Sequence, residues 1–281
     1  MAGRNGAVVR RMQLGRILRE LREQAGLSLE VAAPALDWSS SKLSRIENGH
    51  QGVDVHGVRS MLDVYDVGGE RWTELIELAR SVAAKGWWRA YGLDDKGYVP
   101  LEAEATLVRD ASSAFVPGLL QTEAYARAVF AVALHPRTEA EVDNLTAVRR
   151  VRQERLTSAE DPLELIAVVD EAVLRRPVGG RAVIRAQLAH LVEAAALDRM
   201  TLQVLPLRLG AHPGLSAPFT LLTFGGIGVG DMVYVEHAIG AVYLSKEDEV
   251  AVATLKVDRL RSLALDPNDS VALIRRVAAE T

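Results

Sequence analysis

The sequence predicts two domains of different fold class, an all-α N-terminal domain of four to five helices and a mixed α+β C-terminal domain with a sheet of about five strands. Apolar residues recur at helical spacing in residues 13–68, whereas short apolar runs bounded by Pro and Gly dominate after residue 162. A chain of 281 residues suffices for one small domain and one of ordinary size. We expect a basic arm (1–12), a helical domain (13–68), a connector helix with an aromatic linker (69–100) and a C-terminal domain (101–281).

Four short helices are predicted in the first domain. The first ends at Gly26, the second begins with Ser28 as its cap, and the third covers Ser40–Asn48 and ends at Gly49, where a left-handed residue is favourable. The fourth covers Asp54–Tyr65. Their inward faces are apolar and consist of Leu14, Ile17, Leu18, Leu21, Ala25, Leu29, Ala32, Ala33, Leu36, Val55, Val58, Met61, Leu62 and Tyr65.

The second and third helices, joined by a turn at Asp37-Trp38, have the order and spacing of a helix-turn-helix. On the third helix Leu43 and Ile46 define the inward face at about 100° per residue. The opposite face carries short polar groups and one guanidinium, which suit the edges of bases in a major groove. The predicted DNA-binding residues are Ser41, Ser44, Arg45 and Asn48, with the N-cap Ser39 and the flanking Ser40 and Lys42 closer to phosphates.

Glu47 points toward the inward face of the third helix. An unpaired carboxylate would be too costly there, so a cationic partner is required. Arg22, late in the first helix, is the predicted partner.

A family resemblance is carried by LGRILRELREQAGLS through SSKLSRIENG, which is similar to the phage-repressor-like (XRE-type) helix-turn-helix regulators. The resemblance puts Ser41 to Arg45 in a recognition helix and matches Arg22 and Glu47 to the family's internal ion pair. Further segments resemble the C-terminal domain of unknown function in many actinobacterial regulators; they are WWRAYGL, VPGLLQTEAYARA, AVVDEAVLRRPVGG, LQVLP and VYVEH. Some of these regulators are described as antitoxin-like and are encoded beside a small partner protein.

Charge is distributed unevenly between the two domains. Residues 1–60 hold nine Lys or Arg and six Asp or Glu, a net of +3, so the rest of the chain carries −7 of the total of −4. DNA contact is therefore expected at the N-terminal end only, and two copies would be needed for firm binding, which favours a homodimer. Arg4, Arg10 and Arg11 either form a solvated arm or touch the DNA backbone.

The chain contains no Cys, which excludes disulfides and thiolate sites. Its start lacks the apolar core of a signal peptide, and no run approaches 18 apolar residues. We expect a soluble cytoplasmic protein without a membrane segment.

The connector helix is predicted over Gly69–Lys85 and is followed by four aromatic residues in an irregular stretch, Trp87, Trp88, Tyr91 and Tyr98. These side chains either pack the junction between the domains or form a ligand lid or docking surface.

In the C-terminal domain, Leu101–Arg109 is ambiguous between helix and strand. Five helices and five strands are predicted beyond it. The helices are Gln121–Ala133, Glu139–Thr157, Ala182–Leu197, Lys246–Ala264 and Ser270–Ala279 (capped by Ser270), and the strands are Leu163–Val169, Thr201–Leu205, Phe219–Phe224, Met232–Glu236 and Ala241–Leu244. The outer face of Glu139–Thr157 is basic, with Arg149, Arg150, Arg152 and Arg155, and is either solvated and ion-paired or a second nucleic-acid contact.

No specific catalytic, cofactor or metal motif is present. The glycine-rich Phe224–Asp231 lies between two strands, where no helix N-terminus can hold a phosphate. The spacing of His212, Glu236 and His237 fits no recognised metal site. Asp170 and Glu171 either form a carboxylate pair or, at the end of a strand, pair with Arg175 or Arg176. We expect no enzyme activity and no cofactor.

The predicted function is a homodimeric, sequence-specific DNA-binding regulator acting on an inverted repeat. The C-terminal domain either senses a small molecule or docks a small partner protein, and in the second case DNA binding would be autoregulatory. A ligand pocket would be drawn from Trp88, Tyr91, Gln121, Tyr125, Glu171, Arg175 and His237.

Overall fold

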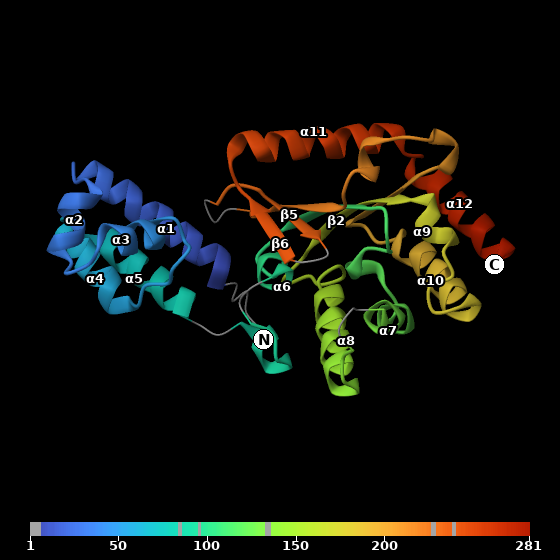
Figure 1. Ribbon diagram of the computed structural model, residues 1–281, viewed down its shortest axis with the longest axis horizontal. Helices are drawn as coiled ribbons and strands as arrows, with labels where there is room; N and C mark the ends of the chain where they lie inside the picture. The colour runs from blue at the N-terminus through green and yellow to red at the C-terminus, as the bar shows by residue number, and fades with distance from the viewer. Residues whose placement is uncertain (1–6, 84–85, 95–96, 133–135, 226–228, 238–239) are drawn as a thin grey trace. The chain divides into compact units, whose positions relative to one another are not determined.

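The computed structural model describes residues 7–83, 86–94, 97–132, 136–225, 229–237 and 240–281, which form two compact units (Figure 1). The N-terminal unit reaches Glu104, and the C-terminal unit begins at Ala105. The predicted combination of an all-α domain followed by an α+β domain is confirmed.

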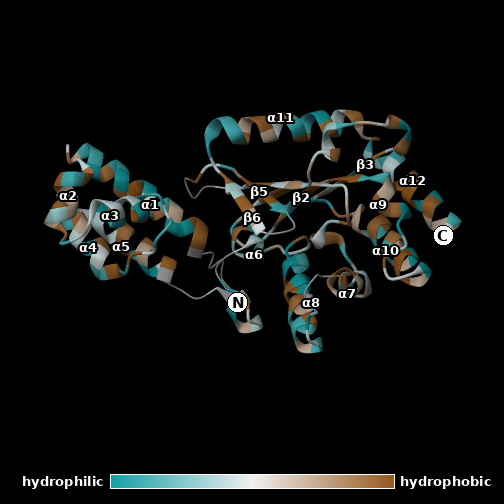
Figure 2. Ribbon diagram, in the orientation of Figure 1, coloured by the Kyte–Doolittle hydropathy of each residue, from teal (hydrophilic) through white to brown (hydrophobic). Residues whose placement is uncertain are grey.

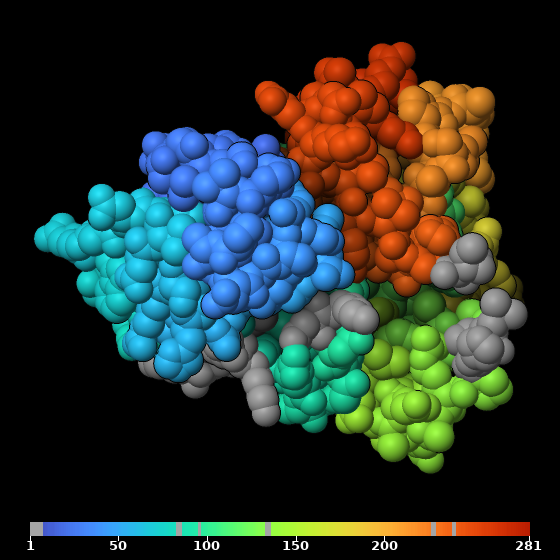
Figure 3. Space-filling view, turned by 60° about the vertical axis from the view of Figure 1, so that its left-hand side comes forward, coloured from blue at the N-terminus to red at the C-terminus, as the bar shows by residue number. Residues whose placement is uncertain are grey.

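The N-terminal unit is a bundle of five helices, coloured blue to cyan in Figure 3. They are α1 (Ala7–Gln24), α2 (Leu29–Ala35), α3 (Ser40–Glu47), α4 (Val55–Val64) and α5 (Gly69–Ala83), followed by η1 (Trp87–Tyr91) and α6 (Tyr98–Glu102). One core, which includes Leu14, Leu18, Leu43, Met61 and Leu75, joins all five helices. The predicted apolar faces of the first four helices therefore meet as expected, except at Ala25, which follows the end of α1 and is exposed.

The predicted connector helix, α5, also belongs to the core of the N-terminal unit. Leu75, Ile76 and Ala79 of α5 are buried in the same core as α1 and α4. Periodicity shows that a helix has an apolar face, but it does not show which neighbour that face covers.

The basic arm is also shorter than predicted, because α1 begins at Ala7 rather than near Gln13. Val9 is fully buried, Arg10 pairs with Glu104 at 3.2 Å, and the Nε of Arg11 donates to the carbonyl of Gly49 at 2.8 Å. These partners are distant in sequence, so the arm could not be assigned from local pattern. Arg4 lies outside the described residues.

Three turn residues adopt positive φ, as their places in the predicted turns require. Gly26 (φ 71°) follows α1, Gly49 (φ 70°) follows α3, and Asp37 (φ 54°) forms the α2–α3 turn. The N-cap of α2 is Ser28, but its side chain makes no capping hydrogen bond, contrary to expectation.

A six-stranded mixed sheet in the order β3-β2-β1-β4-β5-β6 organises the C-terminal unit. Its strands are β1 (Leu107–Ser112), β2 (Glu164–Asp170), β3 (Met200–Leu205), β4 (Phe219–Thr223), β5 (Met232–His237) and β6 (Gly240–Leu244). The strands β1, β2 and β3 run parallel to one another. The strand β4 pairs antiparallel with β1, and β5 pairs antiparallel with both β4 and β6. The segment Leu101–Arg109, which the sequence left ambiguous, contains the end of α6 and the start of β1, so both alternatives occur in it.

Helices cover both faces of this sheet (Figure 1). One face is covered by α11 (Glu247–Leu263), and the other side carries α7 (Glu123–Ala131), α8 (Glu139–Glu154) and α10 (Arg181–Ala194). The short α9 (Glu171–Arg175) follows β2, and α12 (Pro267–Glu280) ends the chain. Strands buried on both faces explain the unbroken apolar run of β2, where only the first residue is exposed.

Ser270 does not cap the last helix as predicted, because α12 begins earlier, at Pro267, and Asp266 is its cap. Ser270 is instead fully buried, and its hydroxyl accepts a hydrogen bond from the Val204 amide at 2.9 Å. A proline at the first helical position, which needs no amide hydrogen, accounts for the earlier start.

Candidate nucleic-acid interface

The helix α3 is held rigidly at both ends. The hydroxyl of Ser39 accepts a hydrogen bond from the Lys42 amide at 3.2 Å, as its predicted role as N-cap requires. At the other end α1 passes very close, since a Cβ on Gly15 would lie 2.5 Å from the carbonyl oxygen of Ile46. Only glycine allows this approach, so the backbone itself fixes α3 against α1.

The inward face of α3 combines apolar packing with a buried ion pair. Leu43 and Ile46 are almost completely buried. The Arg22 Nε donates to one carboxylate oxygen of Glu47 at 2.7 Å, and its second terminal nitrogen donates to the other oxygen at 2.9 Å. The predicted pair between these residues is thus present and bidentate, the geometry that makes a guanidinium–carboxylate contact strong and directional.

The outward face of α3 is open to solvent. Ser39, Ser41, Arg45 and Asn48 are exposed, whereas Ser40, Lys42 and Ser44 are half-buried. Besides Ser39, three of these side chains have local partners. The Asn48 side-chain amide donates to the Ser44 carbonyl at 2.8 Å and to the Ser44 hydroxyl at 3.3 Å, and the Lys42 ammonium lies 3.9 Å from the centre of the Trp38 ring. These contacts orient Asn48 and Lys42 without covering them.

Arg45 differs from the other cations near α3. Its side chain makes no hydrogen bond or ion pair with any residue in the described part of the chain. An exposed guanidinium with five unused donors on a rigid helix can approach the acceptor edge of guanine or a phosphate. The α2–turn–α3 geometry with this outward face defines a DNA-binding helix-turn-helix domain.

Comparison with protein families agrees with this assignment. Residues 13–75 match a family described as a helix-turn-helix domain, and residues 96–276 match a family described as a domain of unknown function (DUF5753). The chain therefore belongs to the DUF5753 family and carries a DNA-binding helix-turn-helix domain at its N-terminal end. No curated protein matches it.

The seven candidate ligand-pocket residues are distributed over both units. Trp88, which is fully buried, and Tyr91 belong to the N-terminal unit. In the C-terminal unit Tyr125 is buried with its hydroxyl accepting from the Val116 amide, and Glu171 pairs with Arg175 at 2.8 Å. His237 ends β5 and is exposed. Gln121 lines a hollow in the C-terminal unit.

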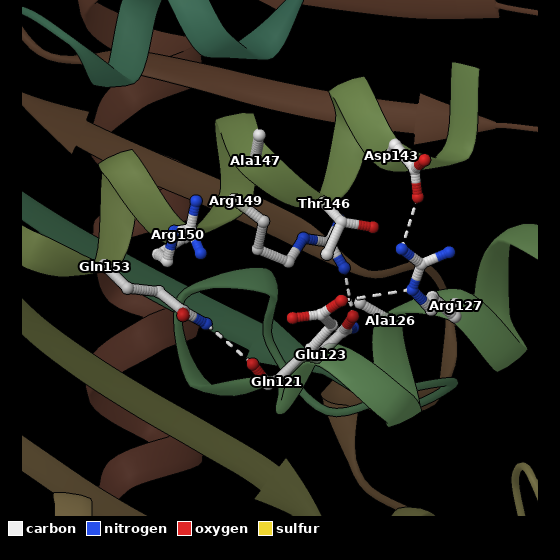
Figure 4. Close-up of a pocket in the computed structure, with 10 residues that line it drawn as sticks. All are labelled: Gln121, Glu123, Ala126, Arg127, Asp143, Thr146, Ala147, Arg149, Arg150 and Gln153. Carbon is white, nitrogen blue, oxygen red and sulfur yellow. Dashed lines mark hydrogen bonds and ion pairs between the residues drawn. The ribbon is translucent and has the colours of Figure 1, made fainter. Parts of the chain in front are cut away.

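That hollow is a groove of about 260 Å³ between α7 and α8 (Figure 4). Arg149 and Gln153 point from α8 toward Gln121, with Arg149 donating to the Gln121 side chain and Gln153 donating to its carbonyl at 2.7 Å. Arg127 spans the groove between Glu123, at 3.2 Å, and Asp143. The groove is thus lined by both positively and negatively charged side chains, and no local pattern in the sequence predicts it.

The basic face predicted on Glu139–Thr157 is only partly exposed. Arg152 is buried, and Arg155 pairs with Asp161 at 3.0 Å and donates to the Ala105 carbonyl at 2.8 Å. The inward position of these two arginines could have been predicted from the sequence, because Arg152 and Arg155 continue the apolar stripe of Leu145 and Val148 at intervals of three and four residues. Figure 2 shows the helix as largely hydrophilic, although part of that surface faces inward.

Asp170 pairs with His212, whereas Glu171 pairs with Arg175, as the alternative for the two acids predicts. The His212 Nε2 lies 3.0 Å from a carboxylate oxygen of Asp170, and both side chains are buried. His212 lies in a loop 42 residues away, so the sequence did not connect them. The space beside them, lined by Ser112, Ser113 and Gly214, is too small to hold a water molecule.

Among the described residues no three His, Asp or Glu side chains are arranged to hold a metal ion. Glu236 and His237 are neighbours on β5, whereas His212 pairs with Asp170. Residues 226–228 of the glycine-rich segment between β4 and β5 lie outside the described part. No helix within the described ranges is long and apolar enough to cross a bilayer.

Proposed function

We propose that the protein is a cytoplasmic, sequence-specific transcriptional regulator that binds an inverted-repeat operator as a homodimer. Two copies of α3 would enter successive major grooves about 34 Å apart, one turn of DNA. The observation that carries the proposal is the exposed outward face of α3, where Arg45 has no partner among the described residues. The net charge of +3 over residues 1–60 is small for a DNA-binding surface, which supports the use of two copies.

The direct test selects binding sites for the full-length protein from a pool of random duplexes and then titrates the enriched duplex by fluorescence anisotropy. We expect an inverted repeat with half-site centres about 10 base pairs apart, bound by two chains. The affinity should fall steeply with salt, since phosphate contacts release counterions. A pool that shows no enrichment would contradict sequence-specific binding.

We further propose that the groove between α7 and α8 binds a small polar effector. Its volume of about 260 Å³ is near the lower limit for ligand pockets, so a small molecule fits best. Arg150, at its rim, is exposed and makes no ion pair with any described residue. Together with the paired Arg127 and Arg149, this favours a ligand that carries a carboxylate.

Native mass spectrometry of the purified protein tests this second proposal. We expect a small bound species that is absent from an Ala147→Phe variant, because the larger side chain would fill the groove. Ala147 lines the groove and is half-buried, so the substitution leaves the core unchanged. Identical spectra of the two proteins would contradict an effector in this groove.

The alternative function is that of an antitoxin-like component whose main role is to bind a small partner protein. The net charge of −7 beyond residue 60 supports a basic partner. Co-expression with a small protein encoded nearby, followed by sedimentation analysis of the complex, distinguishes this role from effector sensing.

We also propose that the protein is not an enzyme. The support is that Asp170 and His212, which pair like an acid and a base, are buried beside a space too small for water. Their role in this proposal is to fasten the loop of His212 to the end of β2.

A further inference from the structure

The outer side of α11 carries an exposed apolar pair. The inner side of the helix packs on the sheet through Ala253, Val257 and Leu260. On the opposite side Val252 and Leu255 are 66% and 69% exposed, among the most exposed large apolar side chains in the described residues. They lie three residues apart and therefore share one face of the helix.

Two opposite charges flank this apolar pair at equal distances. Asp248 lies four residues before Val252, and Arg259 lies four residues after Leu255. Both are exposed, and neither forms an ion pair within the described ranges; the Asp248 carboxylate only accepts from the adjacent Glu249 amide. At intervals of four, three and four residues, the four side chains form one stripe along the helix.

This stripe is complementary to itself when it is turned around. In an antiparallel pair of α11 helices related by a two-fold axis midway between Ala253 and Thr254, Val252 lies opposite Leu255 of the second copy. Asp248 then lies opposite Arg259 of the second copy, and the same pairing repeats at the other end. A parallel arrangement would instead place like charges together, so the pattern selects one orientation.

We infer that a second copy of this chain binds along α11, with Val252 and Leu255 at the centre and two Asp248–Arg259 pairs at the ends. The inference deepens the proposed function, because it rests on the homodimer proposed there and names its contact surface. A stripe along a single helix buries less than the roughly 800 Å² per partner of a standard interface, so the dimer is weak without DNA and depends on concentration. DNA with two half-sites would then strengthen it.

The exposed edge strand β6 is the competing surface. Val242 and Tyr243 on β6 are 44% and 42% exposed, and the edge has unpaired backbone groups that another strand could use. Tyr243 already packs on Tyr234, with 5.5 Å between the ring centres, and β6 carries no charges that would specify a partner. The self-complementary charges therefore favour α11.

The test is sedimentation velocity of the full-length protein, without DNA, over a concentration series. Asp248→Arg and Arg259→Asp should each weaken dimerisation about tenfold or more, because each change places two like-charge pairs in the interface. The double variant Asp248→Arg/Arg259→Asp should restore dimerisation, since each pair across the interface again joins opposite charges, with their positions exchanged. Leu255→Glu should leave a monomer, and high salt should weaken the wild-type dimer.

Val242→Lys is the matched control on β6 and should leave the dimer intact. A wild-type protein that stays monomeric throughout, a double variant no better than the single ones, or dissociation by Val242→Lys alone would overturn the inference. A heterologous protein bound at Val252 and Leu255 of a monomeric chain would overturn it as well.

DNA binding is measured separately on the same proteins. If the protein binds DNA selectively but the charge-reversal variants dimerise as the wild type does, the α11 contact is refuted and the proposed function stands. If dimerisation depends on Asp248 and Arg259 but the dimer prefers no DNA sequence, the proposed function is refuted and the α11 contact stands.

Discussion

Arg22 and Glu47 join the end of α1 to the end of the recognition helix through two hydrogen bonds of 2.7 and 2.9 Å. Arg22 also donates to the Leu27 carbonyl at 2.7 Å, which ties the α1–α2 turn to the same point. The hydrogen bond with Glu47 raises the pKa of Arg22 above its ordinary value, although burial acts in the opposite direction. The pair therefore fixes the orientation of α3 while its outer face stays free.

Replacing Arg22 by Met should destabilise the N-terminal unit by about 3–5 kcal/mol, because Glu47 would be left buried without its partner. Chemical denaturation of the full-length protein, followed by circular dichroism, measures the change. The double variant Arg22→Met/Glu47→Leu should recover much of the loss, since neither charge then remains buried. Melting of the single variant at the wild-type midpoint would show that the pair is not important for stability.

Replacing Arg45 by Ala should weaken specific DNA binding about 10- to 100-fold, which corresponds to about 1–3 kcal/mol for one base contact. Stability should not change, because the side chain is exposed. Anisotropy titration with the selected duplex gives the affinity. Arg71→Ala on α5 removes the same charge from an exposed ion pair and serves as control. Equal affinities of both variants would remove Arg45 from the interface.

Replacing Gly15 by Ala should destabilise the N-terminal unit by about 1–3 kcal/mol, the usual range for overpacking. The new Cβ would lie 2.5 Å from the Ile46 carbonyl oxygen and 2.8 Å from that of Glu47, so α1 and α3 must separate. Gly68→Ala is the control, because no atom lies within 4 Å of a Cβ at that position. Thermal unfolding of both variants tests this, and equal midpoints would contradict the close approach of the helices.

Replacing Glu171 by Gln should remove part of the acid sensitivity of the C-terminal unit. Burial tends to raise the pKa of Glu171, but hydrogen bonds from the Leu207 amide and Arg175 outweigh it, and the pKa is lowered overall. A lowered pKa means that the contribution to stability is present above the unfolded pKa of about 4.3 and is lost as the pH falls through the folded value.

Unfolding free energies measured between neutral pH and pH 3 test this prediction. The wild type should lose stability more steeply than Glu171→Gln over the acidic part of this range, and the variant should be less stable at neutral pH. Parallel curves for the two proteins would contradict the role of the ionised carboxylate.

The sequence by itself determined the N-terminal domain in nearly every respect that matters for DNA binding. The 3.6-residue period sets which side of α3 is buried, so Leu43 and Ile46 on one side and Arg45 on the other follow from spacing alone. A buried Glu47 likewise needs a cationic partner, because an unpaired buried carboxylate is too costly. Arg22, the predicted partner, is present at hydrogen-bond distance. The stop signals at Gly26 and Gly49 are local backbone requirements, which a sequence shows directly.

Only the tertiary structure decided features that depend on residues far apart in the chain. The pairing of Asp170 with His212, the partners of Arg10 and Arg11, and the groove around Gln121 all join distant segments. The periodicity of α5 predicts an apolar face, but it does not show that this face completes the core of the N-terminal unit. The physical reason is the same throughout: local spacing fixes which side of an element is apolar, whereas packing of the whole chain fixes what covers it.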